Sequence, residues 1–225
     1  LISSLTISLP DKKASGGKED AMAGKRRVLI VGGTGTIGSE LTRILRADRD
    51  GLDIVAAARS DASRRTLEAA GFATVAMDLD DHRSLPAALE GVDTVFTLKD
   101  YSIAFLIHAK RLIDAAEQAG VRHYIDVSSM APRHLPYAPM GWNRLVDAYL
   151  AASGMGFTIL HPNLFMDNIL RFIDRDNGVI RHLIGDFPAG WIAAKDIARV
   201  AAAAIRDPGR FRGQTIALAT DRRSF

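Results

Sequence analysis

The sequence contains no cysteine among its 225 residues. Disulfides, thiolate metal ligands and cysteine nucleophiles are therefore excluded. The six histidines show no His-Glu-x-x-His or similar spacing, so we expect no metal site. No apolar run approaches the roughly 18–20 residues that a membrane-spanning helix needs. The basic residues are dispersed and the net charge is only +3, which argues against direct nucleic-acid binding and leaves small acidic molecules such as phosphates as expected ligands.

The first part of the chain differs in composition from the rest. Residues 1–24 begin with a short mixed apolar stretch and are then rich in Ser, Gly, Lys and Asp. They lack the basic-then-apolar order of a secretory signal peptide, and Met22 opens a more compact run. We expect a disordered or vector-derived tail at 1–24, a single domain at 25–225, and a cytoplasmic location by default.

From Arg27 onward, short β-branched runs alternate with amphipathic stretches. Near-continuous apolar strands are typical of a parallel sheet that is covered on both faces. Repeated strand–helix–strand units predict right-handed crossovers. We therefore predict an α/β fold: a doubly wound parallel (Rossmann) sheet in three α/β/α layers. Strands are expected at 27–32, 52–58, 73–78, 92–98, 121–129, 156–162 and 213–219, and helices at 39–47, 67–70, 84–90, 103–119 and 194–205.

The pattern is less regular after Pro162. A helix is expected over 164–173, with turns at Asn177-Gly178 and at 188–190. We expect residues 163–192 to contribute to the substrate side of the domain. Because the chain ends soon after its last predicted strand, the C-terminal substrate region is expected to be small or truncated.

The stretch VGGTGTIG, residues 31–38, lies between the first predicted strand and the first predicted helix. Its glycines satisfy both G-x-G-x-x-G and G-x-x-G-x-x-G, the spacings with which a dinucleotide-binding loop admits a diphosphate to backbone N–H groups. The alternative is a glycine-rich turn that serves packing alone. The residues expected to bind the cofactor here are Gly32, Gly33, Thr34, Gly35, Thr36, Ile37 and Gly38.

The end of the second strand predicts which dinucleotide is preferred. An NAD site usually carries Asp or Glu there, whereas this chain has Arg59, whose planar guanidinium can stack on adenine and pair with a 2′-phosphate. We therefore expect NADP(H), with NAD(H) less favoured. Arg64 and Arg65 follow, and a solvated helix face explains them equally well.

Acidic residues cluster at the end of the third strand. Asp78 is expected to accept a hydrogen bond from the adenine amino group, with the backbone of Leu79 beside it. Together with Asp80 and Asp81 it could instead form a cation site, but no second acidic cluster supports that reading. A helix cap is the preferred interpretation of Asp80 and Asp81.

Several further motifs occur in a fixed order over about Val28 to Leu218: AARS, MDLDDHRSLPAALEGVDTVF, AGVRHYIDVSSMAP, SGMGFTILHPNLFMDN and AAKDIARVAAAAIRDP. With VGGTGTIG they make the chain resemble the NmrA-like group of atypical short-chain dehydrogenase/reductases. The resemblance implies NAD(P)(H) binding; some such proteins reduce quinones or dyes, and others sense cofactor redox state as regulators. It also implies that the nicotinamide side is lined by Thr97, Leu98, Lys99, Val127, Ser128, Ser129, His161, Pro162, Asn163 and Phe165.

The Tyr-Lys pair of the wider superfamily is absent. The residue four after Tyr137 is Gly141, and the positions that match the lysine and glutamate of NmrA-like proteins are Asn143 and Asp147. Asn143 can still form hydrogen bonds but carries no charge to depress a neighbouring pKa. The expected catalytic residues are Ser128, Asn143 and Tyr137; a loop anchor is the alternative for Tyr137, and a plain surface lysine is the alternative for Lys99.

Two functions follow as hypotheses. The first is an NADP(H)-dependent oxidoreductase that transfers hydride to a small, quinone-like acceptor, for which positioning matters more than a proton-donating dyad. The second is a catalytically silent redox sensor that changes its regulatory partner with the cofactor state. An epimerase or isomerase shares the fold but needs the missing dyad. A homodimer or a regulatory protein partner is expected.

Overall fold

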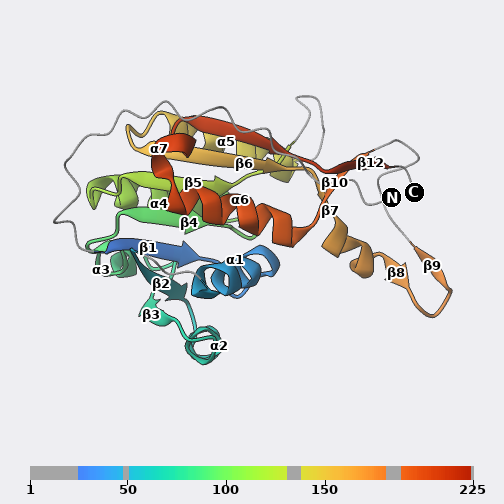
Figure 1. Cartoon of the computed structure of the whole chain (residues 1–225), viewed down its shortest axis with the longest axis horizontal. Helices are drawn as coiled ribbons and strands as arrows, with labels where there is room; N and C mark the ends of the chain where they lie inside the picture. The colour runs from blue at the N-terminus through green and yellow to red at the C-terminus, as the bar shows by residue number, and fades with distance from the viewer. Residues whose placement is uncertain (1–24, 48–50, 131–137, 181–188, 224–225) are drawn as a thin grey trace.

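The computed structural model describes residues 25–47, 51–130, 138–180 and 189–223, and every structural statement below refers to these ranges. Seven strands form one sheet in the order β11-β6-β5-β4-β1-β2-β3, and every neighbouring pair is parallel (Figure 1). The strands are β1 (Arg26–Val31), β2 (Leu52–Ala58), β3 (Ala73–Ala76), β4 (Thr94–Thr97), β5 (His123–Val127), β6 (Gly156–Pro162) and β11 (Gln214–Leu218).

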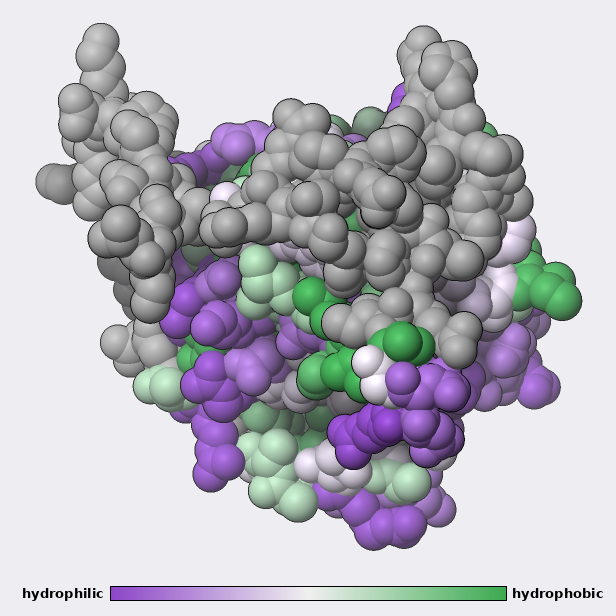
Figure 2. Space-filling model, turned by 90° about the vertical axis from the view of Figure 1, so that its right-hand side faces the viewer, coloured by the Kyte–Doolittle hydropathy of each residue, from purple (hydrophilic) through white to green (hydrophobic). Residues whose placement is uncertain are grey.

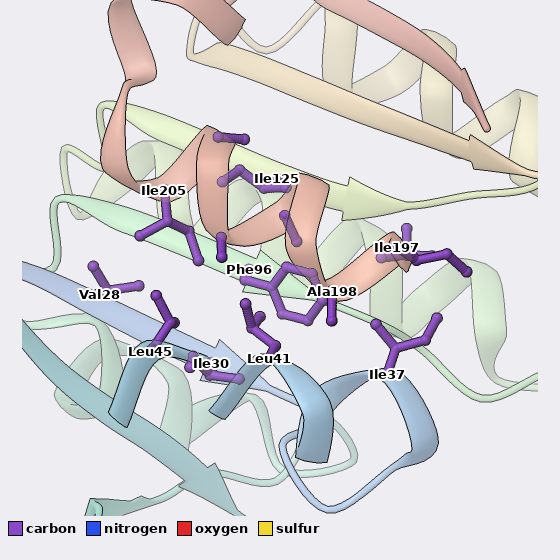
Figure 3. Packing of buried hydrophobic residues seen from close by; sticks show 14 of the residues in the cluster. Val28, Ile30, Ile37, Leu41, Leu45, Phe96, Ile125, Ile197, Ala198 and Ile205 are labelled. Carbon is purple, nitrogen blue, oxygen red and sulfur yellow. The ribbon is translucent and has the colours of Figure 1, made fainter. Parts of the chain in front are cut away.

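Helices cover both faces of this sheet, which confirms the predicted doubly wound fold (Figure 1). On one face, α1 (Thr36–Ala47), α2 (Asp61–Ala69) and α6 (Ala194–Arg206) bury apolar side chains against β1, β2, β4 and β5. Figure 3 shows Leu41 of α1 and Ala198 of α6 pointing toward Phe96 of β4. On the other face lie α3 (Leu85–Leu89), α4 (Phe105–Gln118) and α5 (Ala138–Ala151).

The strand order reverses between β1 and β4. From β1 the chain builds outward through β2 and β3, and then returns to place β4 on the other side of β1. Open parallel sheets bind ligands at such a switch point, beyond the carboxyl ends of the strands. The fold therefore places the glycine loop after β1 next to the loops that follow β4, β5 and β6.

Apart from the helix expected over 164–173, the predicted helices and strands are present with adjusted bounds. The short helix expected at 67–70 is the end of the longer α2, and the one expected at 84–90 is divided into the 3₁₀ turn η1 (His82–Ser84) and α3. Pro86 lies in the first turn of α3, where its missing N–H costs no hydrogen bond. The residues expected to form the tail, 1–24, lie outside the described ranges.

The helix expected over 164–173 is wrong. The segment instead contains β7 (Leu164–Phe165), the 3₁₀ helix η2 (Met166–Arg171) and β8 (Ile173–Asp174), which pairs with β9 (Val179–Ile180). The reason is tertiary: β7 pairs with β10 (Ala189–Ile192). The Asp167 carboxylate also accepts from the backbone N–H of Ala194, 2.8 Å away, and so caps α6.

A second, three-stranded sheet with the order β12-β10-β7 was not predicted. It joins β7 and β10 to β12 (Asp221–Arg223). The short helix α7 (Pro208–Phe211) lies between α6 and β11 along the chain. The turn expected at 188–190 is therefore corrected, since Ala189 and Gly190 begin β10, while residue 188 lies outside the described ranges. The turn at Asn177-Gly178 is confirmed. None of the helices in the described ranges is long and apolar enough to cross a membrane.

Candidate functional site

The glycine loop joins β1 to α1, and three of its glycines leave little room for a Cβ atom. Gly32 has φ +85°, and a Cβ atom there would lie 2.7 Å from the carbonyl oxygen of Leu98 in the loop after β4. A Cβ atom on Gly38 would lie 2.0 Å from the carbonyl oxygen of Gly32, and one on Gly33 would lie 3.1 Å from Leu67 of α2. These three glycines therefore serve packing, in agreement with part of the alternative interpretation.

Gly35 differs, because packing does not require it. A Cβ atom there would meet only the Gly32 carbonyl oxygen, at 3.4 Å, and the exposed residues Thr34 and Thr36 flank it. In the described ranges no acceptor is found for the backbone N–H groups of Thr36, Ile37 and Gly38 at the start of α1. Open space beside unpaired N–H groups at a helix N-terminus suits a diphosphate, so this chain's residues fit the dinucleotide that the loop predicts.

Arg59 follows β2 at the same edge of the sheet and is exposed. Its guanidinium has no ion-pair partner among the residues that the structure describes. Arg64, by contrast, lies on the outer face of α2 and pairs with Asp61 at 3.1 Å and Glu68 at 3.4 Å. Arg59 therefore has its charge available at this edge, whereas Arg64 fits the solvated-face interpretation.

The acidic cluster after β3 is mostly occupied by local contacts. The carboxylate of Asp78 accepts from the backbone N–H of Asp80, and Asp81 accepts from the N–H of Arg83 and caps η1, as predicted. Arg111 of α4 donates to the carbonyl oxygens of Leu79 and Asp80. Within the described part of the chain, no group of three or more His, Asp or Glu residues is placed to hold a metal ion.

An open cavity of about 190 Å³ lies beside the glycine loop at the carboxyl ends of β4, β5 and β6. Figure 2 views the molecule from the side toward which these strands point in Figure 1, and shows apolar side chains gathered among hydrophilic ones. The cavity is lined by Leu98, Lys99, Tyr101, Val127, Ser128, Ser129, Met130, Asn143, Pro162, Asn163, Leu164, Phe165 and Asn168.

Most of the residues expected on the nicotinamide side are thus brought together, but two are not in the lining. Thr97 is fully buried in β4. His161 instead points to α5, where its Nε2 lies 2.8 Å from the Oδ2 of Asp147. Tyr137 lies outside the described residues. Tyr101 also lines the cavity and is not among the residues expected from the sequence, although its place four residues after β4, at a strand's carboxyl end, is a usable signal.

Asn143 links Ser129 and Tyr101 in the wall of the cavity through hydrogen bonds. It is 2% exposed, and its Nδ2 donates to the Oγ of Ser129 at 2.8 Å and to the hydroxyl of Tyr101. The Tyr101 ring stacks on Phe105, with centroids 5.3 Å apart. The amide at the position that the resemblance matches to a lysine is therefore engaged with two hydroxyl groups and brings no charge to the cavity.

Lys99 brings a positive charge to the lining of the cavity. Its side chain is 4% exposed and its ammonium group forms an ion pair with Asp126 of β5, whose side chain is 1% exposed. Burial raises the pKa of the Asp126 carboxyl group, and the positive charge of Lys99 opposes that rise. The alternative interpretation of Lys99 as a plain surface lysine is therefore wrong: the residue is a buried cation in the lining of the cavity.

Comparisons with known proteins agree with this geometry. An NAD(P)H azoreductase of Xenophilus azovorans is 37% identical over 187 residues, which cover 81% of this chain and 64% of the azoreductase. The NADPH complex of a quinone oxidoreductase from Escherichia coli superposes with a TM-score of 0.77 at 25% identity, covering 87% of this chain and 70% of that one. The transcriptional regulator NmrA, in complex with NAD, has a TM-score of 0.71 at 23% identity, covering 90% and 68%.

The likeness to NmrA shows a shared fold and agrees with the resemblance drawn from the motifs. This chain spans slightly less than two thirds of the azoreductase's length. A family model described as NAD(P)H-binding matches residues 32–208. The chain therefore belongs to this NAD(P)H-binding family.

Proposed function

We propose that the protein is an NADP(H)-dependent reductase of a small conjugated acceptor, such as a quinone or an azo compound. The observation that carries the proposal is the continuity of the site. Gly32 of the cofactor loop contacts Leu98, and Leu98 lines the cavity, so a dinucleotide on the loop would extend toward a pocket for a second molecule. When bound, the cofactor supplies a hydride at its nicotinamide ring.

The preference for NADP(H) rests on Arg59. An exposed guanidinium with no described partner, at the end of β2, can bind a 2′-phosphate in a bidentate manner. NADPH is also the cofactor in the Escherichia coli quinone oxidoreductase complex, a structure similar to this one. We therefore assign the diphosphate to the N–H groups of Thr36, Ile37 and Gly38, and the phosphorylated ribose to Arg59.

A conjugated acceptor suits a cavity that lacks the Tyr-Lys dyad. Its reduced form spreads negative charge over several atoms, which lowers the demand on a strong proton donor, so positioning contributes most of the rate. The azoreductase and the quinone oxidoreductase among the similar proteins are named for acceptors of this kind. Leu98, Met130 and Phe165 supply apolar contacts for a planar ring.

The test is NADPH oxidation against a panel of quinones, azo dyes and aldehydes, with cofactor binding measured separately by calorimetry. We expect tight NADPH binding, weaker NADH binding and turnover of quinones or azo dyes in preference to simple aldehydes. Binding of NADPH without turnover of any acceptor would contradict the reductase, and absence of binding would contradict the site itself.

A redox sensor is the second candidate. It is favoured by Asn143, which occupies the lysine position and is tied to Ser129 and Tyr101 rather than left for a substrate. A sensor must change conformation with the cofactor state. Limited proteolysis with NADPH, with NADP⁺ and without cofactor distinguishes it, because a sensor gives different cleavage patterns and a plain reductase gives one pattern for both bound states.

A further inference from the structure

Two buried polar groups in the cavity lining have unused hydrogen-bonding capacity. Ser128 is 6% exposed, and its Oγ has no partner among the residues that the structure describes. Lys99 donates one N–H to Asp126, and in the described ranges no acceptor is found for its other two. Buried donors are normally satisfied, so these groups call for an acceptor that the protein itself does not supply.

The sheet brings the two groups to the same place. The register pairs Thr97 of β4 with Asp126 of β5, and alternate residues of a strand point to the same face. Lys99 follows β4 by two residues, and its ammonium group reaches Asp126 and lies over Phe105 of α4. Ser128 follows directly after β5 and lines the same cavity as Lys99. The Lys99 ammonium group lies at the Asp126 carboxylate, and the Cα atoms of Asp126 and Ser128 are about 7 Å apart, the length of two strand rises. An oxygen atom bound between them can therefore accept from both Lys99 and Ser128.

We propose that Lys99 and Ser128 bind the acceptor oxygen that becomes negative during reduction, and that Lys99 donates the proton to it. This inference rests on the proposed reductase function and names its acceptors: quinones and other conjugated compounds whose reduced form is an oxyanion. Lys99 thus supplies, from the loop after β4, the charge that Asn143 on α5 lacks.

Electrons and protons balance in this step. A hydride adds to the conjugated system, the displaced π-electron pair moves to the acceptor oxygen, and an Nζ–H bond of Lys99 breaks as the new O–H bond forms. Lys99 is left as a neutral amine and regains its proton from water after the product leaves. Ser128 donates to the same oxygen and remains protonated throughout.

Asp126 acts as a positioning residue in this arrangement. Its carboxylate fixes the ammonium group, which would otherwise be a flexible chain end, and compensates its charge in a buried setting. The Phe105 ring contributes as well, since the ammonium lies 5.9 Å from its centroid. The ion pair and the ring together hold the ammonium group at the edge of the cavity.

A phenol probe tests the oxyanion site without turnover. The pH midpoint of 4-nitrophenol, followed through the visible absorbance of its phenolate, is measured on the protein with and without NADP⁺. We expect the wild-type protein to lower the midpoint by at least about one pH unit, a tenfold preference for the phenolate. The same titration is run on Lys99→Met/Asp126→Leu, which removes both charges together and so leaves no unpaired buried carboxylate. The matched control is Lys195→Met, at an exposed lysine on α6 outside the cavity lining.

The inference requires the double variant to lose the shift and the Lys195→Met variant to keep it. It also requires kcat with a quinone to fall by at least about 100-fold in the double variant while the Kd for NADPH is unchanged. A folded double variant that retains the shift, or a wild-type protein that shows none, overturns it. If the shift is intact but no acceptor is reduced, the reductase and the proton transfer are overturned, and the oxyanion site stands.

Discussion

A Cβ atom on Gly38 would lie 2.0 Å from the carbonyl oxygen of Gly32, whereas one on Gly35 would lie 3.4 Å from the same oxygen. The two glycines of one motif thus meet different constraints. Gly38 must stay small so that α1 can pack on the end of β1, because no flexible side chain can give way there. A Cβ atom on Gly35 would not clash with the protein, so the small size of this residue matters for a ligand that approaches the loop from solvent.

We therefore predict different outcomes for two matched alanine substitutions. Gly38→Ala should destabilise the fold by at least about 3 kcal/mol, because backbone must move to relieve the clash. Gly35→Ala should keep the wild-type melting temperature within a few degrees and weaken NADPH binding by at least about tenfold, since its methyl group occupies the approach of the diphosphate. Thermal melts and calorimetry measure both. A Gly35→Ala variant that binds NADPH normally would show that the diphosphate lies elsewhere.

Arg59 gives a prediction about cofactor choice. Replacing Arg59 with alanine should raise the Kd for NADPH by about 10–100-fold, the cost of losing a charge-assisted hydrogen bond, and leave the Kd for NADH nearly unchanged. Arg64→Ala is the matched control, because that guanidinium is already paired with Asp61 and Glu68. Equal weakening of both cofactors, or a loss in the control as large as in Arg59→Ala, would remove Arg59 from the 2′-phosphate site.

The sequence was sufficient to predict the main sheet and the glycine-rich turn between β1 and α1. Both are specified by local patterns: apolar strands of four to seven residues, helical spacing in α1 and α6, and glycines at set intervals. The β7–β10–β12 sheet was missed because its strands are two to four residues long and pair across long separations. Such strands carry no periodic signal of their own, and tertiary pairing decides them.

The cavity was predicted only in part, for a related reason. The sequence pattern predicts Asp126 only as one residue of a buried strand, since nothing in its neighbourhood indicates a partner. Its contact with Lys99 depends on the register of β4 and β5, which the structure supplies. The resemblance indicates that Asn143 replaces a lysine on α5. The three-dimensional structure was needed to show that Lys99 enters the same cavity from the loop after β4.

His123 predicts how stability changes with pH. Its Nε2 lies 2.8 Å from the hydroxyl of Thr158, which itself donates to the carbonyl oxygen of Phe211, so the ring donates from Nε2. The Nδ1 is buried and has no partner in the described ranges, and a proton there would be a buried, unpaired charge. Burial above all, with the charges of Arg212 and Arg26 adding, lowers the His123 pKa from 6.5 to about 4.

Between these two pKa values the unfolded chain takes up a proton that the folded protein does not. The free energy of unfolding should therefore fall as the pH is lowered from about 6.5 to about 4, by at most about 3 kcal/mol from this residue. Urea unfolding at several pH values measures the slope, and His123→Gln should reduce it. His82→Gln, at an exposed histidine, is the control and should leave the slope as it is. An unchanged slope in His123→Gln would assign the acid sensitivity to other groups.

The Lys99–Asp126 pair predicts a pH dependence of stability opposite to that of His123. Burial raises the pKa of Asp126 above its usual 3.8, and Asp147 adds to that rise while Lys99 and His161 counter it. With Lys99 replaced by methionine, the carboxylate stays buried without its main partner. We expect Lys99→Met to lose about 3–5 kcal/mol of unfolding free energy at pH 8. The loss should shrink as the pH falls toward 4, because the folded state binds the proton that the unfolded state still lacks.

The double variant Lys99→Met/Asp126→Leu separates charge from packing. Because it removes both ions together, it should unfold within about 1 kcal/mol of the wild-type protein, or be more stable, and show no such pH dependence. Urea titrations of the single and double variants at pH 8, 7, 6 and 5 complete the cycle. Equal, pH-independent losses in both variants would contradict the prediction, because they would show that an unpaired Asp126 carboxylate is not what destabilises Lys99→Met.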